Sequence, residues 1–176
     1  MQDNNIKRIV IVGGGSAGWM TAAALSRLIQ PEHCQVRLIE SDEIGTVGVG
    51  EATIPQFQLF NKLLGLDENE FIRKTQGTFK LGIQFVDWKN FGHKYIHAFG
   101  QVGLDMEGLQ FYQYWSKMHA MGKADELGSY TLSGLASEHN KFMRSINAGN
   151  SPLSNITYAF HFDAGLYARF LREYSE

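Results

Sequence analysis

The chain has 176 residues, of which 44% are hydrophobic and 19% charged, and its formal net charge is −2. This balance is typical of a globular protein with its own core and excludes the strongly basic surface that nucleic acid or an anionic membrane attracts. The single cysteine, Cys34, excludes an internal disulfide and fits a reducing, cytoplasmic setting, and no apolar run approaches the ~20 residues of a membrane span.

The first predicted elements are a strand, a glycine-rich turn and a helix. Residues 6–12 are apolar and rich in β-branched side chains, residues 13–18 read GGGSAG, and residues 19–28 have helical spacing. A second apolar run, residues 35–39, ends at Glu40. This order predicts the βαβ unit of a dinucleotide-binding fold.

The residues of the turn have separate roles in this prediction. Gly13 permits a tight turn, Gly15 lets the backbone approach a pyrophosphate, and Gly18 lets the helix pack on the strand. The helix is expected to begin near Ser16. The free N–H groups of its first residues, Ser16 and Ala17, and the positive end of its dipole are then expected to face the phosphates.

Glu40 supplies the acidic residue that such a unit needs after its second strand. Its carboxylate is expected to accept hydrogen bonds from ribose hydroxyls and to repel a 2′-phosphate, which disfavours NADP. The alternative is an ordinary glycine-rich turn. The preceding strand, the following helix and Glu40 together favour dinucleotide binding.

The remainder of the chain alternates between helical and extended patterns. Residues 42–55 are expected to form a loop, and Asp67 and Asp163 are expected to cap helices. The six histidines are scattered, so no metal site is expected. Helices are predicted over residues 56–64, 67–75, 108–121, 133–145 and 164–174, and strands over 79–88, 94–99 and 157–162, with a turn at 89–92 between the first two strands.

Four segments carry a family resemblance. They are residues 9–19, the sequence GVGEATIP at residues 48–55, the sequence FKLGIQF at residues 79–85 with Trp88, and residues 161–171. On these segments the chain resembles the FAD-dependent halogenases typified by the tryptophan halogenases.

The resemblance implies an α/β, Rossmann-type FAD-binding fold of the glutathione reductase and flavin monooxygenase type, with an inserted β-hairpin and helices. Residues 1–55 would bind the dinucleotide, residues 56–162 would form the substrate and tunnel region, and residues 163–176 would begin a further helix. It also implies reduced FAD from a separate NADH-dependent reductase, a chloride or bromide ion, hypohalous acid as the product of their reaction with oxygen, a small indole-type substrate and a possible homodimer.

Lys80 matches the family's lysine beside the substrate. Its ammonium would donate a hydrogen bond to hypohalous acid and raise its electrophilicity, whereas a neutral amine would form a haloamine. Burial decides between the two forms because desolvation lowers the pKa of a lysine. Without the resemblance, Lys80 is an ordinary strand lysine.

Other family positions carry over in the same way. Ile83 matches a residue that lines the substrate site, and His97 and Phe99 match rings that face the aromatic substrate; the alternative for these rings is core or edge packing. Ala98 stands where the best-known members have proline. Gly50, Glu51 and Ala52, with Gly48, match a strap around the flavin, for which the alternative is a glycine turn before a helix.

The family's later motifs do not occur in this sequence. Its second catalytic carboxylate, its Trp-x-Trp-x-Ile-Pro signature and its halide site have no counterpart, so the chain resembles the N-terminal third of the family and is expected to be a fragment. Two alternatives stay open: a flavin-dependent aromatic monooxygenase and a non-catalytic, truncated flavin-binding module. A disulfide reductase is excluded because it needs a cysteine pair.

Overall fold

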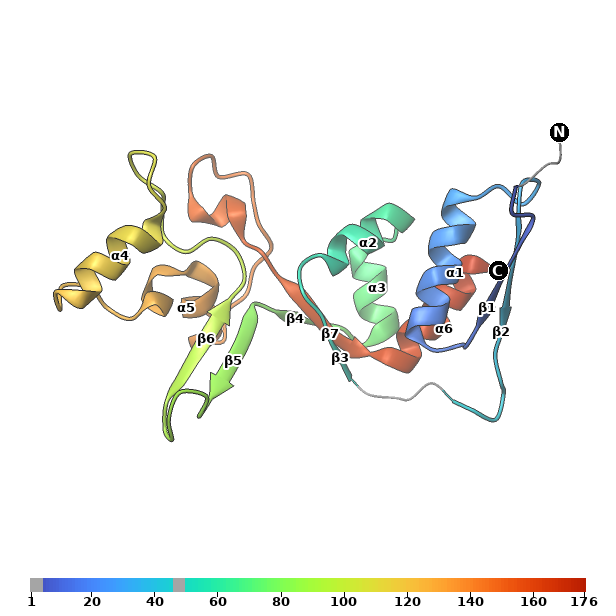
Figure 1. Cartoon of the computed structure of the whole chain (residues 1–176), viewed down its shortest axis with the longest axis horizontal. Coiled ribbons are helices and arrows are strands. Elements are labelled where there is room, and N and C mark those ends of the chain that lie inside the picture. The colour runs from blue at the N-terminus through green and yellow to red at the C-terminus, as the bar shows by residue number, and fades with distance from the viewer. Residues whose placement is uncertain (1–4, 46–49) are drawn as a thin grey trace. The chain divides into compact units, whose positions relative to one another are not determined.

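The computed structural model describes residues 5–45 and 50–176 (Figure 1). The chain forms two compact units, which we call the first unit, Met1–Thr78 with Phe160–Glu176, and the second unit, Phe79–Ala159. It passes from one unit to the other within strand β4 (Thr78–Lys80) and again within strand β7 (Ala159–Asp163).

The first unit begins with the predicted βαβ arrangement. Strand β1 (Arg8–Val12), helix α1 (Ser16–Leu28) and strand β2 (Gln35–Ile39) follow one another, and the two strands pair in parallel from Arg8 opposite Gln35 to Val12 opposite Ile39. The helix returns the chain so that both strands run the same way, as the crossover in a βαβ unit requires. This part of the prediction is confirmed.

Aromatic rings form the core of the first unit. They come from helices α2 (Phe57–Leu64), α3 (Glu68–Thr75) and α6 (Ala164–Ser175) and from strand β7. Ring centroids in this cluster lie between 4.8 and 6.2 Å apart, in tilted and edge-to-face arrangements that favour aromatic pairs. The five members of the cluster are Phe57, Phe71, Phe160, Phe162 and Tyr167.

One polar pair is buried in this core. The Tyr167 hydroxyl donates a hydrogen bond to Asn61 Oδ1 at 3.0 Å, which gives the buried amide oxygen a partner. Burial also raises the pKa of Tyr167, so this residue stays a neutral donor. The pair joins α2 to α6.

Both predicted aspartate caps are confirmed. Asp67 accepts a hydrogen bond from the Glu70 N–H at 2.8 Å, and Asp163 accepts one from the Leu166 N–H at 2.7 Å. Asp163 therefore marks the point where strand β7 changes into α6, which packs against α1 and α3 (Figure 1).

The predicted loop over residues 42–55 is wrong in its last part. Gly50–Ala52 forms strand β3, which pairs antiparallel with β7 from Gly50 opposite Asp163 to Ala52 opposite His161. The short strand lacks an alternating pattern of its own. It forms because β7, more than 100 residues later, offers an edge to pair with.

The second unit contains a β-hairpin and four short helices. Strands β5 (Gly82–Val86) and β6 (Lys94–Ala98) pair antiparallel. The helices are α4 (Phe111–Ala120), η1 (Leu127–Tyr130), α5 (Leu132–Glu138) and η2 (Pro152–Asn155), of which η1 and η2 are 3₁₀ helices.

Two predicted elements of this unit are corrected. The strand expected over 79–88 is two strands, β4 and β5, separated by Leu81, and it ends at Val86. The helix expected over 133–145 ends at Glu138, because Asn140 adopts a left-handed φ of 51° and the Lys141 N–H donates to the Ala136 carbonyl at 2.8 Å. This is how helices commonly terminate.

Within the described part of the chain, no helix is long and apolar enough to cross a membrane.

The aromatic core gives a prediction for stability. Phe71→Ala should lower the free energy of unfolding by about 3–5 kcal/mol, because the Phe71 ring is fully buried and its removal leaves a cavity between the surrounding rings. Phe91→Ala is the matched control: its ring is 96% exposed, and its removal should change stability by less than about 0.5 kcal/mol. Chemical denaturation followed by circular dichroism measures both, and equal effects would contradict the assignment of the core.

Candidate functional site

The glycine turn is shaped by close approaches. A Cβ atom on Gly18 would collide with the Gly13 carbonyl oxygen, so α1 lies directly against the end of β1. Gly13 itself has φ 121°, a conformation that other residues rarely adopt. Unlike at Gly18, no atom of the described residues lies within 4 Å of the Cβ position of Gly15. Gly13 and Gly18 therefore hold the turn together, while the space beside Gly15 is open.

The start of α1 presents backbone donors to that open space. Gly15 is the N-cap residue, and among the described residues no side chain caps this helix end. Ser16 and Ala17 are the first helical residues, so their N–H groups have no acceptor within the helix. Uncapped N–H groups at the positive end of a helix dipole are the usual partners of a phosphate.

Glu40 follows β2 directly and lies beside the glycine turn. Its carboxylate is held by two donors: Trp19 Nε1 at 3.2 Å from Oε2, and Arg172 Nη1 at 2.9 Å from Oε1. The Arg172 guanidinium also lies 5.6 Å from the centroid of the Trp19 ring. We call Trp19, Glu40 and Arg172 the Glu40 clamp. It fixes the carboxylate against Gly14, whose Cβ would collide with it.

Glu176 extends the Glu40 clamp. The Nε atom of Arg172 lies 2.9 Å from Glu176 Oε1, four residues along α6. This hydrogen bond and the charge of Glu176, with smaller contributions from Glu40 and Asp42, raise the pKa of Arg172. Arg172 therefore keeps its charge. Sequence reasoning missed both partners of Glu40, because Arg172 is 132 residues away and no local pattern links them.

The predicted flavin strap lies partly on a strand. Gly50, Glu51 and Ala52 are the residues of β3, and Glu51 is half-buried opposite Phe162. Pairing with β7 fixes the backbone of this segment. Gly48, the other residue predicted for the strap, lies outside the described residues.

Lys80, the last residue of β4, is buried. Its side chain is 7% exposed, and Nζ lies 5.5 Å from the centroid of the Phe99 ring. Burial lowers the pKa of Lys80 because an ammonium loses its hydration there. The negative face of the Phe99 ring compensates part of that loss. A cation removed from water beside an aromatic ring is unusual for a strand lysine.

The residues predicted to contact substrate lie on the hairpin. Ile83 on β5 and His97 on β6 are direct partners in the register, so their side chains project from the same face. Phe99 follows β6 by one residue, and its N–H still donates to the Leu81 carbonyl at 2.8 Å. His97 is exposed, whereas Ile83 and Phe99 are half-buried. The structure thus brings Phe99 to Lys80 and Ile83 to His97.

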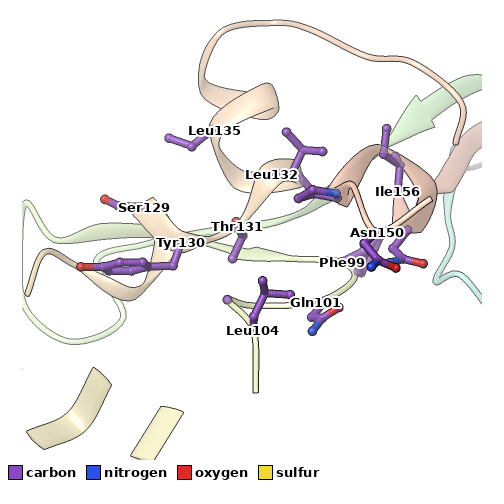
Figure 2. A pocket seen from close by; sticks show the side chains of 14 residues that line it. Phe99, Gln101, Leu104, Ser129, Tyr130, Thr131, Leu132, Leu135, Asn150 and Ile156 are labelled. Carbon is purple, nitrogen blue, oxygen red and sulfur yellow. The ribbon is translucent and has the colours of Figure 1, made fainter. Parts of the chain in front are cut away.

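A cavity of about 330 Å³ opens in the second unit beside Phe99 (Figure 2). Its walls come from three stretches of the chain, residues 99–104, 129–135 and 150–156. We call it the Phe99 cavity. Sequence reasoning missed it, because its walls come from three separate stretches of the chain that meet only when the second unit folds. Over residues 5–45 and 50–176, no group of three or more His, Cys, Asp or Glu side chains is placed to hold a metal ion.

Comparison with known sequences assigns a family. The sequence model of the family described as "Tryptophan halogenase" matches residues 8–176. The tryptophan 6-halogenase SttH of Streptomyces toxytricini is 34% identical over an alignment 194 positions long, which covers 100% of this chain and 37% of SttH. The tryptophan 7-halogenase RebH of Lentzea aerocolonigenes is 33% identical, over 97% of this chain and 34% of RebH.

Comparison with solved structures supports the same family assignment. Xcc4156, a flavin-dependent halogenase from Xanthomonas campestris, superimposes with a TM-score of 0.87 at 49% identity, and BrvH, a flavin-dependent halogenase from Brevundimonas sp. BAL3, with 0.87 at 42%. In both cases 98% of this chain and 34% of the other chain are covered. The chain therefore spans about a third of the length of these relatives.

The match begins at the first residue of β1 and continues through α6 to residue 176. It confirms the resemblance that the glycine turn, the GEATIP segment and the Lys80 segment indicate. The α/β fold is that of the N-terminal part of the flavin-dependent halogenase structures. The chain belongs to the tryptophan halogenase family and corresponds to its N-terminal portion.

Proposed function

We propose that this chain is the N-terminal part of an FAD-dependent halogenase that uses reduced FAD, oxygen and chloride or bromide to halogenate an electron-rich aromatic, such as tryptophan or another indole. The observation that carries the proposal is the buried Lys80 beside Phe99, in a chain of this family. Relatives named tryptophan 6-halogenase and tryptophan 7-halogenase support an indole substrate. A separate NADH-dependent reductase would supply the reduced flavin.

The first unit fits the adenosine diphosphate part of FAD, in a Rossmann-type half-site. The pyrophosphate would lie in the open space beside Gly15 and accept hydrogen bonds from the N–H groups of Ser16 and Ala17, and Gly18 keeps α1 close enough to present them. The carboxylate of Glu40, held by its clamp, would accept hydrogen bonds from the ribose. FAD, when bound, supplies the activation of oxygen that oxidises the halide.

β3 would form the flavin strap. The backbone of Gly50–Ala52 is fixed by pairing with β7, so Gly50, Glu51 and Ala52 would present a rigid edge to the cofactor. Residues 1–55 would thus contribute to the FAD half-site, and residues 56–162 to the tunnel and the substrate site.

Lys80 would position the electrophile. As an ammonium it donates a hydrogen bond to the oxygen of hypohalous acid, which draws electrons from the halogen and favours attack by the aromatic ring. As a neutral amine it forms an N–halogen bond while the oxygen–halogen bond breaks, and the released proton and hydroxide leave as water. Burial lowers the pKa of Lys80 and so raises the share of the neutral form at a given pH.

Ile83, His97 and Phe99 would hold the aromatic substrate. Ile83 and His97 share one face of the hairpin, and Phe99 places its ring near Lys80. Flat side chains around an aromatic ring add about 0.5–1.5 kcal/mol per pair beyond the burial of area.

Replacing Lys80 tests the catalytic assignment. In the full-length protein, supplied with a flavin reductase, halide and a panel of indoles, Lys80→Ala should lower halogenated product by at least about 100-fold, because the amine that would position the electrophile is lost. FAD binding should be unchanged. Lys94→Ala is the matched control, since Lys94 is an exposed strand lysine of the same unit. Product formation by Lys80→Ala near the parent rate, measured by mass spectrometry, would remove the assignment.

Replacing Glu40 tests the FAD half-site separately. Glu40→Ala should weaken FAD binding by about 1–3 kcal/mol, or roughly 5–150-fold in Kd, because charge-assisted hydrogen bonds to the ribose are lost. Glu43→Ala changes an exposed glutamate three residues away and should leave Kd unchanged. Flavin fluorescence titration of both variants gives the two constants. Equal FAD affinity for Glu40→Ala and the parent would dispose of the ribose contact.

A further inference from the structure

The Glu40 clamp joins three elements of the first unit at one carboxylate. Trp19 lies on α1, Arg172 lies on α6, and Glu40 follows β2 directly. The two helices pack against each other (Figure 1). Because Oε2 of Glu40 accepts from Trp19, Oε1 has a fixed direction as well, and this is the oxygen that Arg172 binds. The Glu40 side chain is 26% exposed and the Arg172 side chain 50%, so both partners keep access to solvent in the described structure.

Carboxylates surround Arg172. Its Nη1 lies 2.9 Å from Glu40 Oε1, its Nε lies 2.9 Å from Glu176 Oε1, and the charge of Asp42 also acts on it. A dinucleotide adds negative charge, because its pyrophosphate is an anion. Without Arg172, the Glu40 carboxylate would stand uncompensated beside that anion, and like charges repel. Arg172 therefore allows one site to combine a carboxylate for the ribose with an anion at the α1 N–H groups.

The same arginine bears on the 2′-position of the ribose. In dinucleotide sites, an acidic residue accepts a hydrogen bond from a free 2′-hydroxyl, whereas an arginine nearby accommodates a 2′-phosphate. The Glu40 clamp contains both residue types, paired with each other. A phosphate on Arg172 would have to displace the Glu40 carboxylate and approach that of Glu176. The pair therefore favours a free hydroxyl although an arginine is present.

We propose that Arg172 is a positioning residue of the dinucleotide site: it holds the Glu40 carboxylate for a free ribose 2′-hydroxyl, and Glu40 in turn keeps Arg172 from binding a 2′-phosphate. Loss of Glu40 then releases a guanidinium suited to phosphate, in addition to removing a hydrogen-bond acceptor. The proposal rests on the proposed function for the identity of the cofactor, and its tests need no turnover.

Two ligands that differ by one phosphate test the proposal. ADP-ribose has a free 2′-hydroxyl on its adenosine, and 2′-phospho-ADP-ribose carries a phosphate there. Isothermal titration of the full-length protein without FAD should give a Kd for ADP-ribose at least about tenfold lower than for the phosphorylated ligand. Glu40→Ser should shift this ratio by at least about tenfold toward the phosphorylated ligand, because a phosphate then takes the place of the carboxylate on Arg172.

Double variants isolate the part that Arg172 takes in this shift. Glu40→Ser combined with Arg172→Ala should lose the shift. Glu40→Ser combined with Arg169→Ala should keep it, since Arg169 is another exposed arginine of α6. A purely structural role of Arg172 would change both Kd values by the same factor and leave their ratio. No binding of ADP-ribose by the parent, an unshifted ratio in Glu40→Ser, or a shift that survives Arg172→Ala would overturn the proposal.

FAD binding tests the arginine on its own. Arg172→Ala should raise the Kd for FAD, measured by flavin fluorescence, by about 5–30-fold, and Arg172→Lys should recover most of that loss because it keeps the charge. Arg169→Ala is the matched control and should leave this Kd unchanged. With all variants folded by circular dichroism, equal FAD affinity for Arg172→Ala and the parent would contradict the positioning role.

The outcomes separate the two proposals. A ligand preference that depends on Arg172, in a full-length protein that forms no halogenated product, would contradict the proposed function and leave the role of Arg172 standing. Halogenation by a protein whose nucleotide preference does not depend on Arg172 would contradict the role of Arg172 alone.

Discussion

The removal of one ammonium group from water is the constraint on which this account depends. Lys80 ends a strand with its side chain almost completely buried, and its Nζ lies 5.5 Å from the centroid of the Phe99 ring. Such a position costs free energy that a surface lysine does not lose. A reactive oxidant would meet an amine that is held in place, shielded from bulk water and shifted toward its neutral form. This is the environment in which a lysine differs chemically from the other lysines of the chain.

In the first unit, backbone packing and hydrogen bonds, rather than burial of a charge, fix the positions of the α1 N–H groups and the Glu40 carboxylate. At the glycine turn, close backbone contacts at Gly18 and the unusual φ of Gly13 bring α1 against β1, and the described residues leave the position beside Gly15 open. The Glu40 clamp then ties the end of β2 to α1 and α6. Because both carboxylate oxygens already have donors, Glu40 has a defined orientation without a ligand. A preorganised acceptor of this kind loses little conformational entropy when a ribose binds.

Local signals in the sequence predict the local parts of this structure. The βαβ unit follows from apolar runs, glycines and one acidic residue, and the caps at Asp67 and Asp163 follow from short side chains before helical patterns. The same signals give wrong element types or boundaries where tertiary pairing or a single backbone conformation determines the structure. Gly50–Ala52 becomes a strand because β7 pairs with it, and the helix after Leu132 ends early because Asn140 takes a left-handed φ.

In the candidate functional site, too, some features can be predicted from the sequence and others cannot. Lys80 and Glu40 are recognisable from their motifs, but their surroundings are not. Arg172 reaches Glu40 from the far end of the sequence, Phe99 reaches Lys80 from just after β6, and the Phe99 cavity needs three separate segments. Motifs therefore indicate which residues carry the chemistry, whereas burial, pKa and pocket shape emerge only from tertiary packing.

Direct titration of Lys80 tests the central claim most simply. With lysines labelled at the ε-carbon and Lys80→Arg used to assign the resonance, NMR gives the pKa of each lysine in the folded protein. The account predicts that the Lys80 signal titrates at lower pH than those of the exposed lysines, because its burial disfavours the ammonium. A Lys80 signal that titrates together with the exposed lysines would contradict the buried, desolvated amine on which the proposed chemistry rests.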